Sequence, residues 1–203
     1  IPLVEKLGQI FAALVHSPLT SLDVEVHGEL NDYDVSALKL SALKGVFTDV
    51  VSDKVSYVNA PVIAEQRGVE VQLVTSPETE YFRNETILTA SLAHGGTISV
   101  AGTVTGPKHV QKITKISGYD LEIPISEHLL IIEYQDRAGV IAAMSTVLGS
   151  SSINIASMQV SRGDKDNRAV AVFALDSAPS TEVFHSIERI VDAKRAALVN
   201  LSE

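Results

Sequence analysis

A polar junction between a strand-like run and a helix-like run constrains this chain more than any other stretch. Residues 129–134 are typical of a strand, residues 138–148 carry apolar side chains at helical spacing, and a second strand is expected from Ile153. At such a junction the first helical turn offers unpaired backbone N–H groups and a positive dipole end to a carboxylate, while Asp136 and Asn154 offer oxygen atoms to an ammonium group. The sequence therefore predicts a binding site for a small zwitterion.

The same region predicts a complete small domain. Strand, helix, strand, strand, helix and strand follow one another, which is the order of the ferredoxin-like unit, where two helices cover one face of a four-stranded antiparallel sheet. The pattern restarts near residues 123–126, and we place the boundary there, between domains 1–125 and 126–203. The expected elements are strands 129–134, 153–161, 168–175 and 197–201, with helices 138–148 and 181–191.

The first domain is expected to be a mixed α/β unit. Polar and apolar residues alternate most regularly in residues 22–30, and His94-Gly95-Gly96 suits a hairpin turn because glycine permits positive φ. The predicted sheet is antiparallel rather than doubly wound, and the fold class of the chain is predicted as α+β. The expected elements are helices 1–15, 35–51 and one starting near Pro61, with strands 22–30, 69–75, 86–93, 97–105 and 110–116.

Composition excludes several classes of partner. The 203 residues include 25 acidic and 16 basic ones, for a formal charge of −9, so the attraction that drives nucleic-acid binding is missing. No apolar run reaches the roughly 18 residues that a membrane helix needs, and no cysteine is present to form a disulfide or a thiolate site. We expect a cytoplasmic protein without a nucleic-acid or membrane partner. Because the chain starts at Ile1, we also expect a piece of a longer protein.

The chain carries no pattern typical of a catalytic or metal centre. No Gly-x-Gly-x-x-Gly turn follows a strand, as a dinucleotide fold would require, and Ser150-Ser151-Ser152 lacks the Gly-x-Ser-x-Gly context of a nucleophile. We therefore predict no catalytic residue, no metal and no cofactor in this chain. The histidines are too far apart in the sequence to form a ligand pair: His16, His27, His94, His109, His128 and His185.

Residues 126–203 carry motifs that resemble an ACT domain, a small regulatory module that binds amino acids. The spacing between Asp136 and Asn154 is similar to that of two binding residues in the family. ACT domains of this type usually have proline where this chain has Ala138. The resemblance is carried by Tyr134-x-Asp136-Arg137-x-Gly139 at the end of the first strand, then the apolar helix, Gly149 and Ile153-Asn154-Ile155.

Residues 1–125 resemble the intervening domain of long-form D-3-phosphoglycerate dehydrogenases, through Val58-Asn59-Ala60-Pro61, Arg67-Gly68-Val69, 99–103 and 111–113. The resemblance implies the regulatory part of an enzyme that oxidises 3-phosphoglycerate with NAD at the first step of L-serine biosynthesis. NAD would be held by a catalytic half outside this chain, and the chain alone is expected to be inactive. The resemblance also implies that the ACT domains self-associate, as a dimer or tetramer, and bind L-serine between subunits as a feedback inhibitor.

The resemblance assigns the L-serine site to the junction and to the start of the second strand. Two of the residues also suit simpler roles: Asp136 an N-cap, which would stabilise the following helix by about 1 kcal/mol, and Asn154 a turn. Ala138 in place of proline implies a looser loop and an altered affinity for serine. The implied binding residues are Tyr134, Asp136, Arg137, Ala138, Gly139, Val140 and Asn154.

A second site is implied in the first domain, where the family binds an anion. Lys112 matches one of its basic contacts, and Lys108 lies nearby in the sequence. Pro124 and Ala174 stand where two arginines complete the site in a relative. We therefore expect this anion site to be weak or missing, with the lysines on a solvated strand face.

Two other functions stay open. The regulatory portion of an iron–sulfur L-serine dehydratase has a similar pair of domains, although its cluster would need cysteines from a partner segment. The other is a free-standing module that oligomerises through its sheet edges without a ligand. A response of the oligomer to an amino acid distinguishes this last function from the first.

Overall fold

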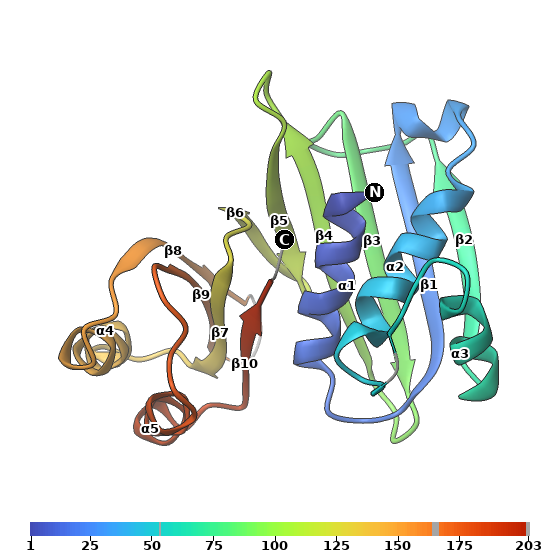
Figure 1. The fold of residues 1–203 in the computed structure, drawn as a ribbon. Helices are drawn as coiled ribbons and strands as arrows, with labels where there is room; N and C mark the ends of the chain where they lie inside the picture. The colour runs from blue at the N-terminus through green and yellow to red at the C-terminus, as the bar shows by residue number, and fades with distance from the viewer. Residues whose placement is uncertain (53, 164–166, 202–203) are drawn as a thin grey trace. The chain divides into compact units, whose positions relative to one another are not determined.

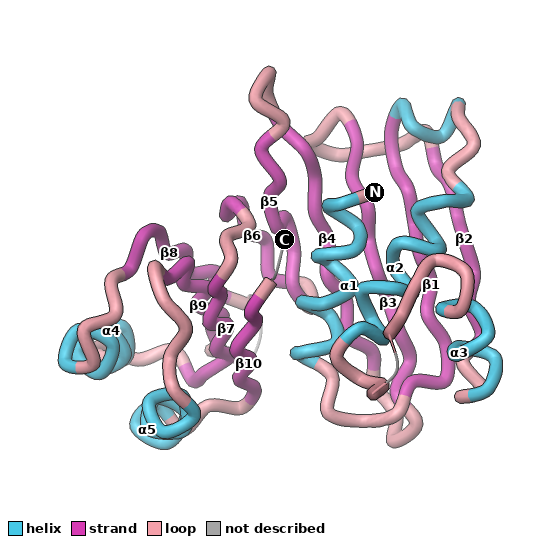
Figure 2. The backbone as a smooth tube through the Cα atoms, in the orientation of Figure 1, coloured by secondary structure: helices cyan, strands magenta, loops and turns pink. Residues whose placement is uncertain are grey.

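The chain divides into two compact units in the computed structural model (Figure 1, Figure 2), which describes residues 1–52, 54–163 and 167–201. Unit 1 spans Ile1–Ser117 and unit 2 spans Gly118–Glu203. Each unit combines helices with a sheet, so the predicted α+β class is confirmed. The division after Ser117 lies earlier in the sequence than the predicted boundary between residues 125 and 126.

Unit 1 is a mixed sheet with α1 and α2 side by side on one face (Figure 1). Its strands follow the order β2-β1-β3-β4-β5, with β1 parallel to β2 and the other neighbours antiparallel. The long connection through α2 and α3 lets β2 run in the same direction as β1, which the predicted antiparallel sheet did not include. The elements are α1 (Pro2–Leu14), β1 (Leu19–Gly28), the 3-10 helix η1 (Glu29–Asp32), α2 (Ser36–Thr48), α3 (Ala60–Gln66), β2 (Glu70–Ser76), β3 (Asn84–Leu92), β4 (Thr97–Thr105) and β5 (Val110–Ile116).

Alternation along β1 decides which face of this sheet is covered. Leu22, Val24 and Val26 are fully buried, whereas the residues between them are partly exposed. Because successive side chains of a strand point to opposite faces, one face belongs to the core and the other remains open. The predicted strand 22–30 therefore exists, although it starts earlier and ends at Gly28, after which the chain turns into η1.

Two glycines hold α1 against α2. A Cβ atom on Gly45 would overlap the carbonyl oxygen of Glu5, and one on Gly8 would come within 2.6 Å of the carbonyl oxygen of Ala42. The two helices thus approach each other backbone to backbone, a distance that only glycine permits. This contact fixes the helical layer over the buried face of the sheet.

Unit 2 contains the predicted strand–helix–strand–strand–helix–strand order. Its sheet has the order β10-β7-β9-β8, every neighbouring pair is antiparallel, and Figure 1 shows α4 and α5 on one face. This is the ferredoxin-like arrangement that the sequence predicts. The elements are β6 (Tyr119–Pro124), β7 (His128–Gln135), α4 (Val140–Ser150), β8 (Ile155–Arg162), β9 (Arg168–Leu175), α5 (Thr181–Val191) and β10 (Arg195–Asn200).

Strand β6 precedes this order and was not predicted. Leu121 and Ile123 alternate with polar residues over only six positions, a run too short to stand out beside Pro124. The strand lies next to β8, where the Glu122 N–H donates to Gln159 Oε1 at 2.6 Å. Residues 119–124, which precede the predicted boundary, therefore belong to unit 2.

The core of unit 2 lies between β7, β9 and the two helices. Leu130, Ile132 and Tyr134 of β7 pack in one cluster with Met144 and Leu148 of α4. Strands β7 and β9 are also buried on their other face, so both appear in the sequence as nearly continuous apolar runs rather than alternating ones. This burial fixes β7 rigidly up to the point where the polar junction begins.

Helix α4 differs from its prediction at both ends. It begins at Val140 rather than Ala138, because Gly139 precedes it with φ of 87°, outside the helical region. It continues through Gly149, the predicted cap, to Ser150, and the left-handed conformation that follows falls on Ser152 with φ of 58°. The junction before the helix is therefore longer than predicted.

No helix within the described parts of the chain is both long and apolar enough to span a membrane.

Candidate functional site

The predicted junction borders a pocket of about 620 Å³ in unit 2. Three segments form it: the end of β7 with the loop that follows, the first turn of α4, and the end of β8. Five of the seven predicted serine-site residues line it, and the residues of β8 were not predicted. The lining residues are Tyr134, Asp136, Arg137, Ala138, Gly139, Ile141, Ala142, Val160, Ser161 and Arg162.

The register of the sheet explains how β8 reaches a pocket at the end of β7. Tyr134 lies opposite Ala169 of β9, and Ala169 lies opposite Arg162 of β8. Directly opposed residues project to the same face of a sheet, so these three form a row across the strands. Tyr134 and Arg162 of this row both line the pocket, with the small Ala169 side chain between them.

An ion pair crosses the pocket. Arg162 Nε lies 2.8 Å from Asp136 Oδ2, with the arginine side chain 77% exposed and the aspartate side chain 21% exposed. The backbone of Asp136 is held from the other side, since its N–H donates to the Asn167 carbonyl at 2.9 Å and Asn167 Nδ2 donates to its carbonyl at 3.1 Å. Asp136 is therefore the anchored partner of the pair, and Arg162 is the partner that solvent surrounds.

The helix that faces the pocket has no side-chain cap. Gly139 is the N-cap residue of α4 and makes no capping bond, and the first helical hydrogen bond runs from the Ala143 N–H to the Gly139 carbonyl. The N–H groups of the first turn thus lack helical acceptors and present the positive end of the helix dipole. The N-cap role considered for Asp136 is wrong, because its carboxylate pairs with Arg162 three residues before the cap.

Tyr134 forms the inner wall of the pocket. The residue is only 1% exposed and packs in the core cluster of unit 2. Burial raises the pKa of its hydroxyl, the nearby Asp136 carboxylate raises it further, and Arg162 partly opposes both. The hydroxyl therefore remains a neutral hydrogen-bond donor at any physiological pH, and it makes no hydrogen bond to another residue of the described ranges.

Asn154 lies at the other end of the sheet. It is exposed and precedes β8, whereas the pocket lies at the last residues of that strand. Its backbone pairs with Asp176, whose Oδ1 accepts from the Asn154 N–H at 2.9 Å and whose own N–H donates back at 3.1 Å. One chain therefore does not bring Asn154 together with Asp136. Val140 is buried under the helix and does not line the pocket either.

The two predicted anion-site lysines lie near one end of β5. Lys112 is a strand residue opposite Thr103, and Lys108 is an exposed residue of the turn before the strand. Neither borders a described pocket of unit 1.

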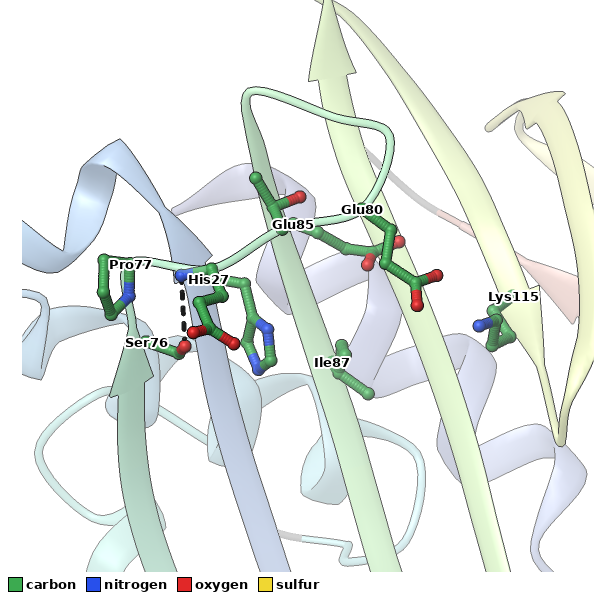
Figure 3. Close-up of a pocket in the computed structure, with 9 residues that line it drawn as sticks. His27, Ser76, Pro77, Glu80, Glu85, Ile87 and Lys115 are labelled. Atoms are coloured by element: carbon green, nitrogen blue, oxygen red, sulfur yellow. Dashed lines mark hydrogen bonds between the residues drawn. The ribbon is translucent and has the colours of Figure 1, made fainter.

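A second polar pocket, of about 740 Å³, lies on the open face of the unit 1 sheet (Figure 3). His27 and Glu85 face each other on β1 and β3, and the loop between β2 and β3, which carries Glu80, passes over them. Two lining residues bond to neighbours outside the lining: His27 Nε2 lies 3.2 Å from Glu25 Oε2, and the Thr114 hydroxyl donates to Glu85. The alternation of β1 is the sequence signal that would have indicated this polar face.

Within the described ranges, no cluster of three or more His, Asp or Glu side chains is arranged to hold a metal ion.

Comparisons with known proteins cover the whole chain. D-3-phosphoglycerate dehydrogenase of Mycobacterium leprae is 36% identical over 202 residues, which make up all of this chain and 38% of the relative. The enzyme of Methanocaldococcus jannaschii is 31% identical over 199 residues, or 98% of this chain and 37% of the relative, and that of Bacillus subtilis is 25% identical over 197 residues, or 97% and 37%. The chain thus spans less than two fifths of the length of these relatives.

One solved structure, a formyltetrahydrofolate deformylase from Pseudomonas syringae pv. tomato, matches 37% of this chain and 28% of its own at 18% identity. Its TM-score of 0.33 is too low to bear on the fold. The family model described as the D-3-phosphoglycerate dehydrogenase intervening domain matches residues 1–117, more than half of the chain. This chain belongs to the D-3-phosphoglycerate dehydrogenase family.

Proposed function

We propose that unit 2 is an ACT domain that binds L-serine, and that the chain is the regulatory part of an NAD-dependent D-3-phosphoglycerate dehydrogenase that serine inhibits. The observation that carries this proposal is the pocket at the β7–α4 junction. It combines an anchored carboxylate, Asp136, with an uncapped helix N-terminus and a free tyrosine hydroxyl. The relatives named above bear the dehydrogenase name and match 97% or more of this chain.

The pocket groups match the three polar groups of serine. An ammonium donates to carboxylates, so Asp136 is its acceptor. A carboxylate is stabilised at a helix N-terminus, where Ile141 and Ala142 of the first turn line the pocket. The Tyr134 hydroxyl, at the inner wall, is placed to hydrogen-bond the ligand's carboxylate or its hydroxyl. A ligand with all three groups therefore fits this pocket better than a simple amine or acid.

We propose further that each serine molecule lies between two copies of the chain. Asn154 and the pocket lie at opposite ends of β8, whose eight residues span roughly 25 Å at the rise of a strand. No small amino acid bridges that length within one chain. A two-fold axis that sets β8 of one copy beside β8 of the other brings Asn154 of each copy to the pocket of its partner.

A ligand at such an interface can inhibit a distant catalytic half. Serine would favour the arrangement of two copies in which both the Asp136 and the Asn154 contacts are made. It can shift the equilibrium between arrangements only by the difference in its binding free energy for them. NAD and 3-phosphoglycerate would bind to the catalytic half. The regulatory effect would then reach catalysis through the relative orientation of the subunits.

Isothermal titration calorimetry with L-serine tests this function. We expect saturable binding at up to millimolar serine with one site per chain, and a larger assembly or a tighter dimer in sedimentation experiments with serine. Glycine and D-serine are suitable controls, since the first lacks the hydroxyl and the second misplaces it. The absence of heat and of any shift in thermal unfolding at millimolar L-serine would count against the proposal.

A further inference from the structure

We propose that Arg162 is the residue that selects ligands with a carboxylate, and that its ion pair with Asp136 opens when the ligand binds. This inference rests on the proposed function, since it assigns a role within the same pocket. Asp136 would exchange the guanidinium for the ligand's ammonium, and Arg162 would exchange the Asp136 carboxylate for that of the ligand. Before the ligand binds, the Arg162 guanidinium thus occupies the position beside Asp136 that the ligand's ammonium would take.

The geometry allows Arg162 to turn while Asp136 stays in place. The Arg162 side chain is 77% exposed and contacts Asp136 through Nε at 2.8 Å. The backbone of Asp136 is held by two hydrogen bonds, one with the Asn167 carbonyl and one from the Asn167 side-chain amide, and its side chain is largely enclosed. An arginine at the end of a strand can change rotamer without disturbing the sheet, because its backbone stays paired with Ala169.

Exchange costs little because an exposed ion pair is weak. Water competes for a guanidinium that is three-quarters exposed, and such pairs contribute little to stability. After exchange, each charged group of the protein again has an opposite charge, now on the ligand. A guanidinium can also bind a carboxylate with two parallel hydrogen bonds, which would fix the orientation of the ligand's carboxylate.

Arg137 is the other cation of the pocket and provides the natural comparison. It also lines the pocket but makes no ion pair with a described residue. It lies in the loop after β7, outside the strand register that sets Arg162 beside the pocket. A purely long-range effect of positive charge would be shared by both arginines. A direct contact with the ligand's carboxylate belongs to Arg162 alone.

The experiment compares Arg162→Gln and Arg137→Gln in the full chain, with L-serine and L-serine methyl ester as the calorimetric ligands. The ester keeps the ammonium and the hydroxyl but lacks the carboxylate. We expect Arg162→Gln to raise the Kd for L-serine about tenfold and to change the Kd for the ester less than about twofold. Arg137→Gln is expected to change the Kd for L-serine less than about threefold, and Arg162→Lys to recover part of the loss.

Thermal unfolding of each variant checks that the fold is intact. An Arg162→Gln chain that binds L-serine as tightly as the parent, or more tightly, would overturn the role of Arg162. Equal losses in both glutamine variants would overturn it as well, because they would indicate general charge. A parent chain that binds neither ligand would overturn the proposed function itself, together with this inference. A parent that binds L-serine more tightly than the ester, with that preference lost only in Arg162→Gln, supports it.

Discussion

The two polar pockets differ in where they lie on their sheets. The pocket of unit 1 covers the open face of neighbouring strands, and two of its lining residues have partners on the same sheet: His27 pairs with Glu25 of its own strand, and Glu85 accepts from the Thr114 hydroxyl. The pocket of unit 2 lies at strand ends, where a loop, a helix N-terminus and the end of β8 converge. Polar side chains on a strand face find hydrogen-bond partners on the same strand or on nearby strands. Groups at strand ends are left with one exposed ion pair and unpaired N–H donors.

Charge separates the two pockets as well. Three glutamates and one lysine line the pocket of unit 1, which therefore repels a carboxylate. One aspartate and two arginines line the pocket of unit 2, beside the positive end of α4. The unit 2 pocket therefore offers more positive charge to a carboxylate than the unit 1 pocket does, and it also offers Asp136 to an ammonium group. This difference in charge favours the pocket of unit 2 as the proposed amino-acid site.

The largest expected effect concerns the helices that support unit 1. Gly45→Ala places a methyl group against the carbonyl of Glu5 in α1, and we expect it to lower the free energy of unfolding of unit 1 by about 3 kcal/mol. Gly149→Ala is the matched control in unit 2, because nothing lies within 4 Å of the added atom, and it should raise stability by about 0.5–1 kcal/mol. Urea unfolding followed by circular dichroism measures both. Equal effects of the two substitutions would contradict the close helix contact.

The next effect sharpens the contrast between the pockets. Asp136→Ala removes the anchored acceptor, and we expect it to raise the Kd for L-serine about 30-fold, or about 2 kcal/mol. Glu85→Ala removes a carboxylate from the pocket of unit 1 and should leave the Kd unchanged. Calorimetry with the two variants gives both values. Serine binding that responds to Glu85 and not to Asp136 would reverse the assignment.

The smallest effect concerns the pH dependence of stability. The pKa of Tyr134 is raised in the folded chain, so the folded state keeps this proton at a pH where the unfolded chain loses it. Its contribution is fully present below about pH 10, the ordinary tyrosine pKa, and is lost as the pH rises towards the folded value. We expect the free energy of unfolding to fall less steeply above pH 10 in Tyr134→Phe. The free energy of unfolding of the variant still falls above pH 10, because a hydrogen bond to Glu5 raises the pKa of Tyr57 too. Identical slopes would contradict the buried hydroxyl.

Much of the fold could be predicted because apolar periodicity marks the elements. Helix α5 has the predicted bounds Thr181–Val191, where Ser180 caps the first turn through its hydroxyl. The parallel pairing of β1 with β2 could not be predicted, because partners distant in the sequence decide it. Strand β6 was missed since its apolar pattern is short, and the start of α4 was misplaced since Gly139 adopts a left-handed conformation.

The candidate site divides in the same way. The lining residues from Tyr134 to Gly139 were predicted because one continuous motif carries them. Arg162 was missed, since it reaches the pocket only through the register of two strand pairs. Asn154 was predicted as part of the same site, between subunits, and in one chain it lies at the end of β8 far from the pocket. The order of elements along the chain does not determine which of their ends lie close together in space.

In the proposed arrangement one serine site uses residues of two chains, and a mixture of two variants tests this sharing. Asp136→Ala and Asn154→Ala chains should each bind L-serine poorly by themselves. When the two are co-expressed with different tags, about half of the dimers hold one chain of each kind, and one of the two sites in such a dimer keeps both residues. We predict that about a quarter of the sites recover parental affinity in calorimetry. A mixture with no recovered sites, or an Asn154→Ala chain that binds like the parent, would contradict the shared site.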